Sequence, residues 1–169
     1  MGVTIHFEGR IRSASHYEAC ACKLRQFATE CGWPMEEIAE DTRTLGRVQN
    51  EEDWDYTGRT RGIELQPDQN ADPFRFEVDE ELFIQEYCKT QFAPPEVHVK
   101  IVDLLRRLEP HFDVLSVIDE GEYFETSDFD LLTEMMDNCF RALDEHLSQN
   151  PGSQGPVRMQ GGRIVDIIS

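Results

Sequence analysis

The chain is poor in lysine and has far fewer basic than acidic residues. Only three of its 169 residues are lysine, and 16 Lys and Arg stand against 34 Asp and Glu, so the formal net charge is −18 with neutral histidines. Binding of nucleic acid through its phosphates requires a basic face that releases counterions. This composition therefore argues against a nucleic-acid-binding protein.

Long apolar segments are missing as well. No run of about 18 apolar residues is present, so we expect no membrane-spanning helix. The segment 1–10 has no basic part followed by an apolar stretch, which argues against a secretory signal. The five cysteines are an odd number without the regular spacing of a disulfide-stabilised secreted domain. These absences favour a cytoplasmic protein with reduced thiols.

Familiar site motifs are absent too. The pair Gly161–Gly162 has no strand-to-helix setting that would cradle a phosphate, and no G-x-S-x-G sequence occurs. Cys20 and Cys22 lie about 200° apart on a predicted helix and cannot converge on one ion. The five histidines, His98 among them, are scattered, and we expect surface or capping roles for them. We expect no metal site and no cofactor.

Hydrophobic periodicity predicts an α+β domain. Apolar and polar residues alternate along 3–11, which is typical of a half-buried strand, whereas spacings of three and four over 15–31 are typical of a helix. The predicted strands are 3–11, 33–38, 42–48, 62–66, 73–78, 82–89 and 112–118, and the predicted helices are 15–31, from 94 to Pro110, and from 127 onward. The short links favour an antiparallel sheet of about five to seven strands, with three helices packed mainly on one face.

The domain organisation follows from a change in composition near residue 150. We expect a single domain over 1–149, a linker over 150–156 that is rich in Gly and Pro, and an apolar tail over 157–169. A disordered tail would seldom carry four aliphatic residues in its last six. We therefore expect the tail to dock back on the domain as an edge strand, or to pair with another copy in a homodimer.

Acidic residues gather in two segments, 36–55 and 119–137. The second segment could bind a divalent cation, but its spacing does not match a calcium loop. It could also be a solvated loop, since carboxylates are favoured where a helix begins. In a third interpretation the two segments form one surface for a basic partner. The residues assigned to that surface are Asp119, Glu120, Glu122, Tyr123, Glu125, Asp128, Asp130, Trp54 and Tyr56.

Two functions remain open from the sequence. The first is a non-enzymatic interaction module of the inhibitor, immunity or adaptor type, which engages a basic protein through the acidic surface. The alternative is a small-molecule-binding domain or an enzyme that uses the open polar face of the sheet. His6, Arg75, Glu86 and Tyr87 are its candidate residues, with an acid/base pair among them. This alternative requires a concave pocket on that face.

Overall fold

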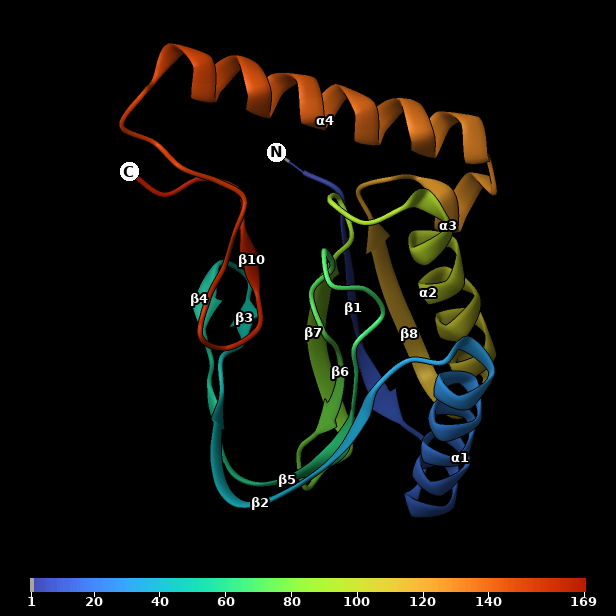
Figure 1. Cartoon of the computed structure of the whole chain (residues 1–169). Coiled ribbons are helices and arrows are strands. Elements are labelled where there is room, and N and C mark those ends of the chain that lie inside the picture. The colour runs from blue at the N-terminus through green and yellow to red at the C-terminus, as the bar shows by residue number, and fades with distance from the viewer. Residues whose placement is uncertain (1) are drawn as a thin grey trace.

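Two antiparallel three-stranded sheets form the centre of the molecule in the computed structural model, which describes residues 2–169 (Figure 1). One sheet has the strand order β7-β1-β8 and the other β2-β5-β6. Their strands are β1 (Thr4–Ile11), β2 (Met35–Leu45), β5 (Tyr56–Leu65), β6 (Phe74–Val78), β7 (Phe83–Lys89) and β8 (Phe112–Asp119). The predicted α+β fold with an antiparallel sheet is confirmed.

The two sheets meet along β6 and β7. The amide of Asp72 donates to the carbonyl of Lys89 (2.9 Å) near one end of this seam, and the amide of Asp79 donates to the carbonyl of Phe83 (3.1 Å) at the other. The six strands therefore follow the order β2-β5-β6-β7-β1-β8. In this order β7 lies between β6 and β1.

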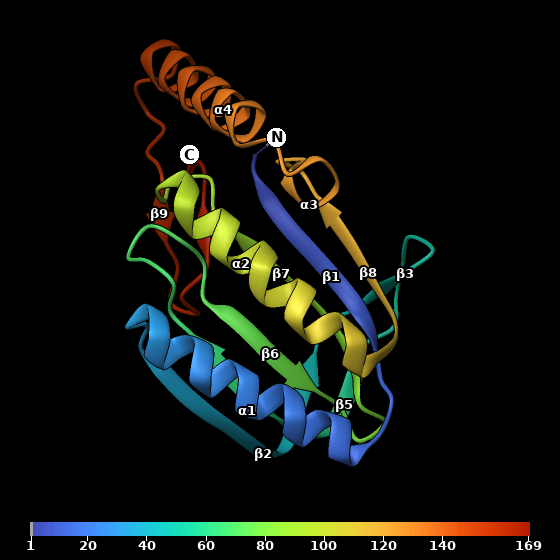
Figure 2. The ribbon, with the colours of Figure 1, turned by 90° about the vertical axis from the view of Figure 1, so that its right-hand side faces the viewer.

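Helices α1 (Ala14–Cys31) and α2 (Pro95–Leu108) cover one face of the sheets (Figure 2). The Ser13 hydroxyl caps α1 by accepting from the amide of His16, and Gly32 ends the helix in the left-handed conformation with φ 69°. Both signals are typical of helix termini. A short 3-10 turn, η1 (Glu109–His111), links α2 to β8.

The main core lies between these two helices and the sheets. Phe7 of β1 and Phe74 of β6 stack with ring centroids 5.1 Å apart, which joins the two sheets on their covered face. Leu24 of α1 and Ile101 of α2 are fully buried against them. Within residues 2–169, no helix covers the opposite face of β7, β1 and β8 (Figure 1).

Helix α4 (Phe129–Gln149), preceded by the single turn α3 (Tyr123–Thr126), lies across one end of the sheets (Figure 1). Leu132 and Met136 of α4 pack on Val3 just before β1. Farther along α4, Leu143 packs with Phe92 and Ile164. The third helix thus differs from the prediction that it packs beside the other two, because its apolar stripe contacts the strand ends and the tail.

The β2–β5 hairpin bends out of the sheet toward the uncovered side (Figure 1). The sequence suggests two short strands at 33–38 and 42–48, but β2 is one strand with a register shift between Glu40 and Arg43. Its extension carries a small hairpin of β3 (Val48–Gln49) and β4 (Glu52–Asp53), which we call the tip. The tip faces the open side of the sheet.

The C-terminal tail folds on itself instead of extending the sheet. Strands β9 (Val157–Arg158) and β10 (Ile164–Val165) pair with each other, so the tail is not the added edge strand suggested by the sequence. It docks on the domain through an ion pair of Lys89 with Asp166 (2.5 Å). The amide of Ile164 also donates to the Asp72 carboxylate (2.7 Å). Pairing of the tail with a second copy stays a prediction.

Gly62 allows the close approach of β5 and β6. A Cβ atom at this position would lie 1.8 Å from the carbonyl oxygen of Phe76, so the two backbones would have to separate. We expect Gly62→Ala to lower the free energy of unfolding by about 3 kcal/mol, at the upper end of overpacking costs. Gly161→Ala is the control because its Cβ would meet nothing within 4 Å. Urea titration of both variants measures the difference, and equal stabilities would contradict the close approach.

Candidate functional site

A pocket of about 640 Å³ lies on the open face of the sheet. Its floor is formed by β1, β7 and β8, and its walls by the end of β2, the tip and the C-terminal tail. The tip and the tail both rise on this side in Figure 1, whereas Figure 2 shows β3 and β9 well apart. The lining includes the polar residues His6, Glu8, Arg43, Arg75, Gln85, Glu86, Tyr87, Ser116, Glu120 and Arg163.

Strand register aligns the floor of the pocket. In the antiparallel pairs, His6 of β1 lies opposite Tyr87 of β7 and opposite Ile118 of β8. Directly paired residues point to the same face of a sheet. The rings of His6 and Tyr87 are consequently close, with centroids 5.9 Å apart. One row across three strands thus presents an imidazole, a phenol and an aliphatic side chain.

His6 is oriented by Glu120, which follows β8. The distance between His6 Nε2 and Glu120 Oε1 is 2.8 Å. Because a carboxylate only accepts hydrogen bonds, Nε2 carries the proton and donates it. In neutral His6 this leaves Nδ1 as an acceptor. An imidazole held in one tautomer by a carboxylate is the usual arrangement of a general base.

Glu86 and Arg163 form the most buried ion pair of the pocket. Glu86 Oε2 lies 2.6 Å from Arg163 Nη2, and the guanidinium lies 4.0 Å above the Tyr87 ring centroid. Arg163 also donates to the carbonyl of Tyr87. Burial raises the pKa of Glu86 above its ordinary value, although the charge of Arg163 opposes that shift. The tail therefore completes a site that begins on β7.

Two further arginines, from different strands, line the pocket. Arg75 of β6 donates from both Nε and Nη2 to one oxygen of Glu64, at 3.0 and 2.6 Å. Arg43 of β2 lies 3.0 Å from the buried carboxylate of Glu77. Ion pairs of this geometry hold a guanidinium in a defined orientation.

The four sequence candidates His6, Arg75, Glu86 and Tyr87 all line this one pocket. The sequence reasoning did not identify Arg43, Arg163 and Ser116 as pocket residues. Alternation along 112–118 could have indicated Ser116, since it shares a face with Ile118. Arg163 had no such signal, because its position depends on how the tail folds.

Arg47 anchors the tip to β7. Its side chain is 2% exposed and lies 2.7 Å from the Asp79 carboxylate, and it also donates to the carbonyl of Phe83 (3.0 Å). The guanidinium lies over the rings of Phe83, Trp54 and Tyr56, at 4.9, 5.5 and 5.4 Å from their centroids. Trp54 and Tyr56, assigned to a partner surface from sequence, thus pack around a buried arginine.

Asp119 is buried and does not belong to an exposed acidic surface. It accepts hydrogen bonds from the amides of Gly121 (2.8 Å) and Phe124 (2.9 Å), and its Oδ2 lies 3.0 Å from His98 Nε2. His98 Nδ1 in turn lies 2.7 Å from the hydroxyl of Thr90. The expectation of a surface or capping role for His98 is therefore wrong.

The pKa of Asp119 reflects this network. Burial alone would raise it, but the hydrogen bond and charge of His98, with the two backbone amides, lower it below its ordinary value. The order carboxylate–imidazole–hydroxyl resembles a catalytic triad, yet all three side chains are buried away from the pocket. Its role is to fix the start of the loop that carries Glu120.

The other residues assigned to the partner surface differ in exposure, and only some of them are accessible to a partner. Glu120 lines the pocket, and Tyr123 is half-buried against the ring of His98. The exposed members are Glu122, Glu125, Asp128 and Asp130. Asp128 also caps α4 by accepting from the amide of Leu131 (2.9 Å).

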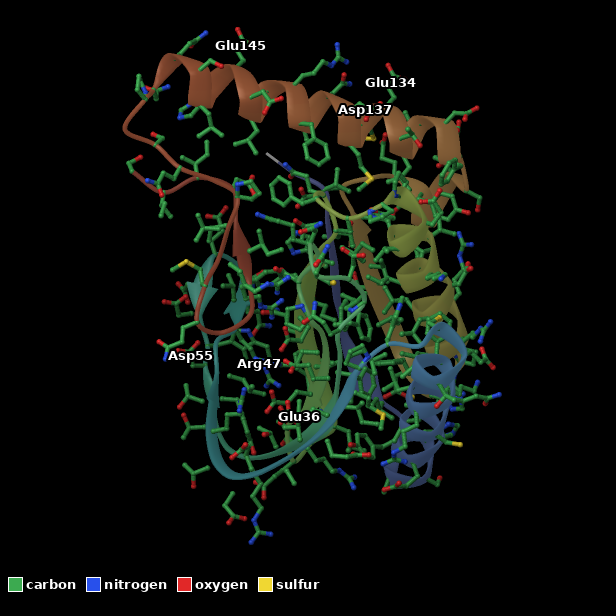
Figure 3. The ribbon with its side chains drawn as sticks, in the orientation of Figure 1. Glu36, Arg47, Asp55, Glu134, Asp137 and Glu145 are labelled. Atoms are coloured by element: carbon green, nitrogen blue, oxygen red, sulfur yellow. The ribbon has the colours of Figure 1, made fainter. Side chains whose placement is uncertain are left out.

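The two acidic segments do not form one continuous surface. In Figure 3, Glu134 and Asp137 lie on α4 at the top of the molecule, whereas Glu36 and Asp55 lie in its lower half. Helix α4 crosses one end of the strands, whereas β2 is an edge strand of its sheet. The two acidic segments therefore belong to separate regions of the molecule. Figure 3 also shows Arg47 close to Asp55, whose carboxylate accepts from the Arg47 amide (3.0 Å).

Comparison of the chain with protein families, with curated proteins and with solved structures found no match. Within residues 2–169, no helix combines the length and apolar character needed to cross a membrane. The same residues contain no group of three or more His, Cys, Asp and Glu side chains placed to hold a metal ion.

Proposed function

We propose that this protein binds a small organic molecule in the pocket on the open face of its sheet. The observation that carries the proposal is the convergence of oriented polar groups from distant parts of the chain: His6, Arg75, Glu86 and Arg163. The volume of about 640 Å³ lies within the range of ligand sites, and such sites combine an apolar lining with a few placed polar groups.

The lining supports this proposal in detail. Leu45 of β2, Val48 of the tip and Ile118 of β8 supply apolar surface around the ring of Tyr87. The charged groups are held by ion pairs, so they would lose little conformational freedom when a ligand binds. His6, oriented by Glu120, adds a base that could act on a bound substrate.

A blocking variant tests whether ligands enter this pocket. Ser116 is exposed and lines the pocket, and Ser116→Trp should fill it without disturbing the core. In a thermal-shift screen against a metabolite library, we expect a ligand at a hundred times its Kd to raise the Tm by about 5 to 10 °C. Ser116→Trp should abolish that shift.

Val114→Trp is the matched control for the blocking variant. Val114 is 75% exposed and lies two residues away on the same strand and face, but it does not line the pocket. We expect this variant to keep the full ligand-induced shift. Hits that stabilise both variants equally would show that binding occurs elsewhere and would contradict the proposal.

We propose a second candidate function, the engagement of a basic partner protein, on a separate observation. Within residues 2–169, the exposed carboxylates of Glu122, Glu125 and Asp130 form no ion pair. The turn α3, which carries Glu125 and follows Glu122, contacts β8, and within the same residues the outer edge of β8 pairs with no other strand. An open edge can accept an added strand, and unpaired acids favour a basic one.

Charge-neutralised variants test this second candidate. We expect the immobilised wild-type protein to capture a basic protein from lysate at low salt, and the triple variant E122Q/E125Q/D130N to fail to capture it. The control E36Q/E51Q/E52Q removes the same charge from the other acidic segment and should retain it. Equal capture by both variants would mean that net charge, and not this surface, retains the protein.

A further inference from the structure

The charges around the pocket are separated by sign across the sheet. Arg43 and Arg75 reach it from β2 and β6, on one side of the central strand β7. Glu8 of β1 and Glu120, just after β8, reach it from the other side. Near the seam between β6 and β7, Arg163 pairs with Glu86 (2.6 Å) and also lies 3.6 Å from the carboxylate of Asp72. The side with Arg43 and Arg75, which we call the cationic wall, presents guanidinium groups that are each paired with a carboxylate, whereas the opposite side, the acidic wall, presents carboxylates.

The cationic wall keeps hydrogen-bond donors free for a ligand. Within residues 2–169, Glu64 engages only Nε and Nη2 of Arg75, while Arg43 contacts Glu77 through Nε and Glu40 through Nη1. A guanidinium has five N–H groups, so the Nη1 of Arg75 and the Nη2 of Arg43 remain available. Paired donors in a fixed plane are suited to a carboxylate.

The acidic wall presents acceptors that are themselves held in place. Glu8 Oε2 accepts a hydrogen bond from the side-chain amide Nε2 of Gln85 (3.0 Å), and Glu120 accepts one from His6 Nε2. Each carboxylate has acceptor sites beyond the one already used. A protonated amine would be stabilised there by charge and by hydrogen bonds.

The two walls are separated by roughly 10 Å, because β6 and β1 lie two strand spacings apart on either side of β7. The space between them is bounded by the Tyr87 ring and by Val48 and Ile118. The charged side chains extend into the pocket from both walls. The distance between the two charges of a ligand must therefore be shorter than the distance between β6 and β1. An aromatic or short aliphatic body fits this interval.

We infer that the ligand is dipolar, with a carboxylate at one end that binds Arg43 and Arg75 and a protonated amine at the other that binds Glu8 and Glu120. This inference rests on the proposed small-molecule function and specifies the class of its ligand. A dianion would meet repulsion at the acidic wall, and a dication would meet it at the arginines.

Three probes with one aromatic ring and different end groups test the inference. They are 4-(aminomethyl)benzoate, terephthalate and 1,4-bis(aminomethyl)benzene, which are a zwitterion, a dianion and a dication. Calorimetric titration should show the zwitterion binding at least about tenfold more tightly than either other probe. Terephthalate or the diamine binding as tightly as the zwitterion would overturn the inference.

Two single variants should change the preference in opposite directions. Arg75→Gln should weaken binding of the zwitterion about tenfold and favour the diamine, whereas Glu120→Gln should weaken it similarly and favour terephthalate. Arg59→Gln is the control, since Arg59 is exposed and lies outside the pocket. Equal effects of all three variants would overturn the inference.

The same experiments separate failure of the inference from failure of the proposed function. If no probe binds, but an uncharged hit from the screen is lost with Ser116→Trp and kept with Val114→Trp, the pocket is a ligand site and only its dipolar preference is wrong. If hits bind regardless of Ser116→Trp, both the ligand site and the inference built on it are overturned.

Discussion

Replacing Asp119 with alanine is expected to lower the free energy of unfolding by about 3 to 5 kcal/mol, a large part of the stability of a domain of this size. The variant removes the acceptor for His98 and for the amides of Gly121 and Phe124, and all three donors would be left in a buried region. Unsatisfied buried donors retain their desolvation cost. Chemical denaturation of the purified protein measures the change.

Glu125→Ala is the control from the same acidic segment. Its side chain is exposed, so we expect a change within about 0.5 kcal/mol. If the two variants were equally stable, Asp119 would not be part of a buried network, and its original assignment to a partner surface would stand. The comparison thus distinguishes a carboxylate that stabilises the fold from one that is available to a partner.

The contribution of Asp119 should also depend on pH. Because its pKa is lowered in the folded protein, the carboxylate stabilises the fold above its ordinary pKa of 3.8, and this contribution is lost as the pH falls through the folded value. The stability difference between the wild type and Asp119→Asn should therefore stay level near neutral pH and narrow as the pH falls below 3.8. A difference that stays constant over this range would contradict the lowered pKa.

Replacing Arg47 with methionine is expected to cost about 3 to 5 kcal/mol, because it leaves the buried Asp79 carboxylate without its partner. It also loosens the tip, which is attached to β7 as well by the hydrogen bonding of Val48 with Gln85 (2.9 and 2.8 Å) and by the packing of Trp54 on Phe83. Hydrogen exchange should speed up at the amides of Val48 and Trp54. Arg47→Met should also weaken ligand binding, since the tip forms a wall of the pocket.

Arg59→Met and Arg47→Lys complete this test. Arg59 is exposed and forms no ion pair within residues 2–169, so its replacement should change stability by less than about 0.5 kcal/mol. Lysine at 47 keeps the charge but cannot donate to Asp79 and to the Phe83 carbonyl from one planar group, so an intermediate loss is expected. A fully stable Arg47→Met protein would show that the tip is held by other contacts.

The local elements of this protein could be read from its sequence with good accuracy. Residues 3–11 alternate as a strand does, and β1 covers 4–11, while spacings of three and four over 15–31 match α1. The predicted strands 62–66 and 73–78 lie within or over β5 and β6, which pair with each other. These features depend on neighbouring residues, whose periodicity directly reports which face is buried.

Part of the candidate site followed from the same alternation. Because Phe7 and Ile5 face the core, His6 and Glu8 must face the other side, and Arg75 follows from Phe74 and Phe76 in the same way. What alternation could not show is that β1 lies between β7 and β8, which places His6 beside Tyr87 and near Glu120. Strand order depends on contacts between residues far apart in sequence.

Tertiary structure alone decided which charged residues stabilise the fold and which line a pocket. Asp119 and Glu120 are adjacent acids, yet one is buried against His98 and the other faces the pocket. Arg47 and Arg163 carry the same charge, but one anchors the tip and the other brings the tail to Glu86. A charge is stable inside a protein only when a distant partner meets it. Composition and periodicity therefore determined the fold class and the faces of the strands, while the folding of the tip and tail over the sheet created the pocket.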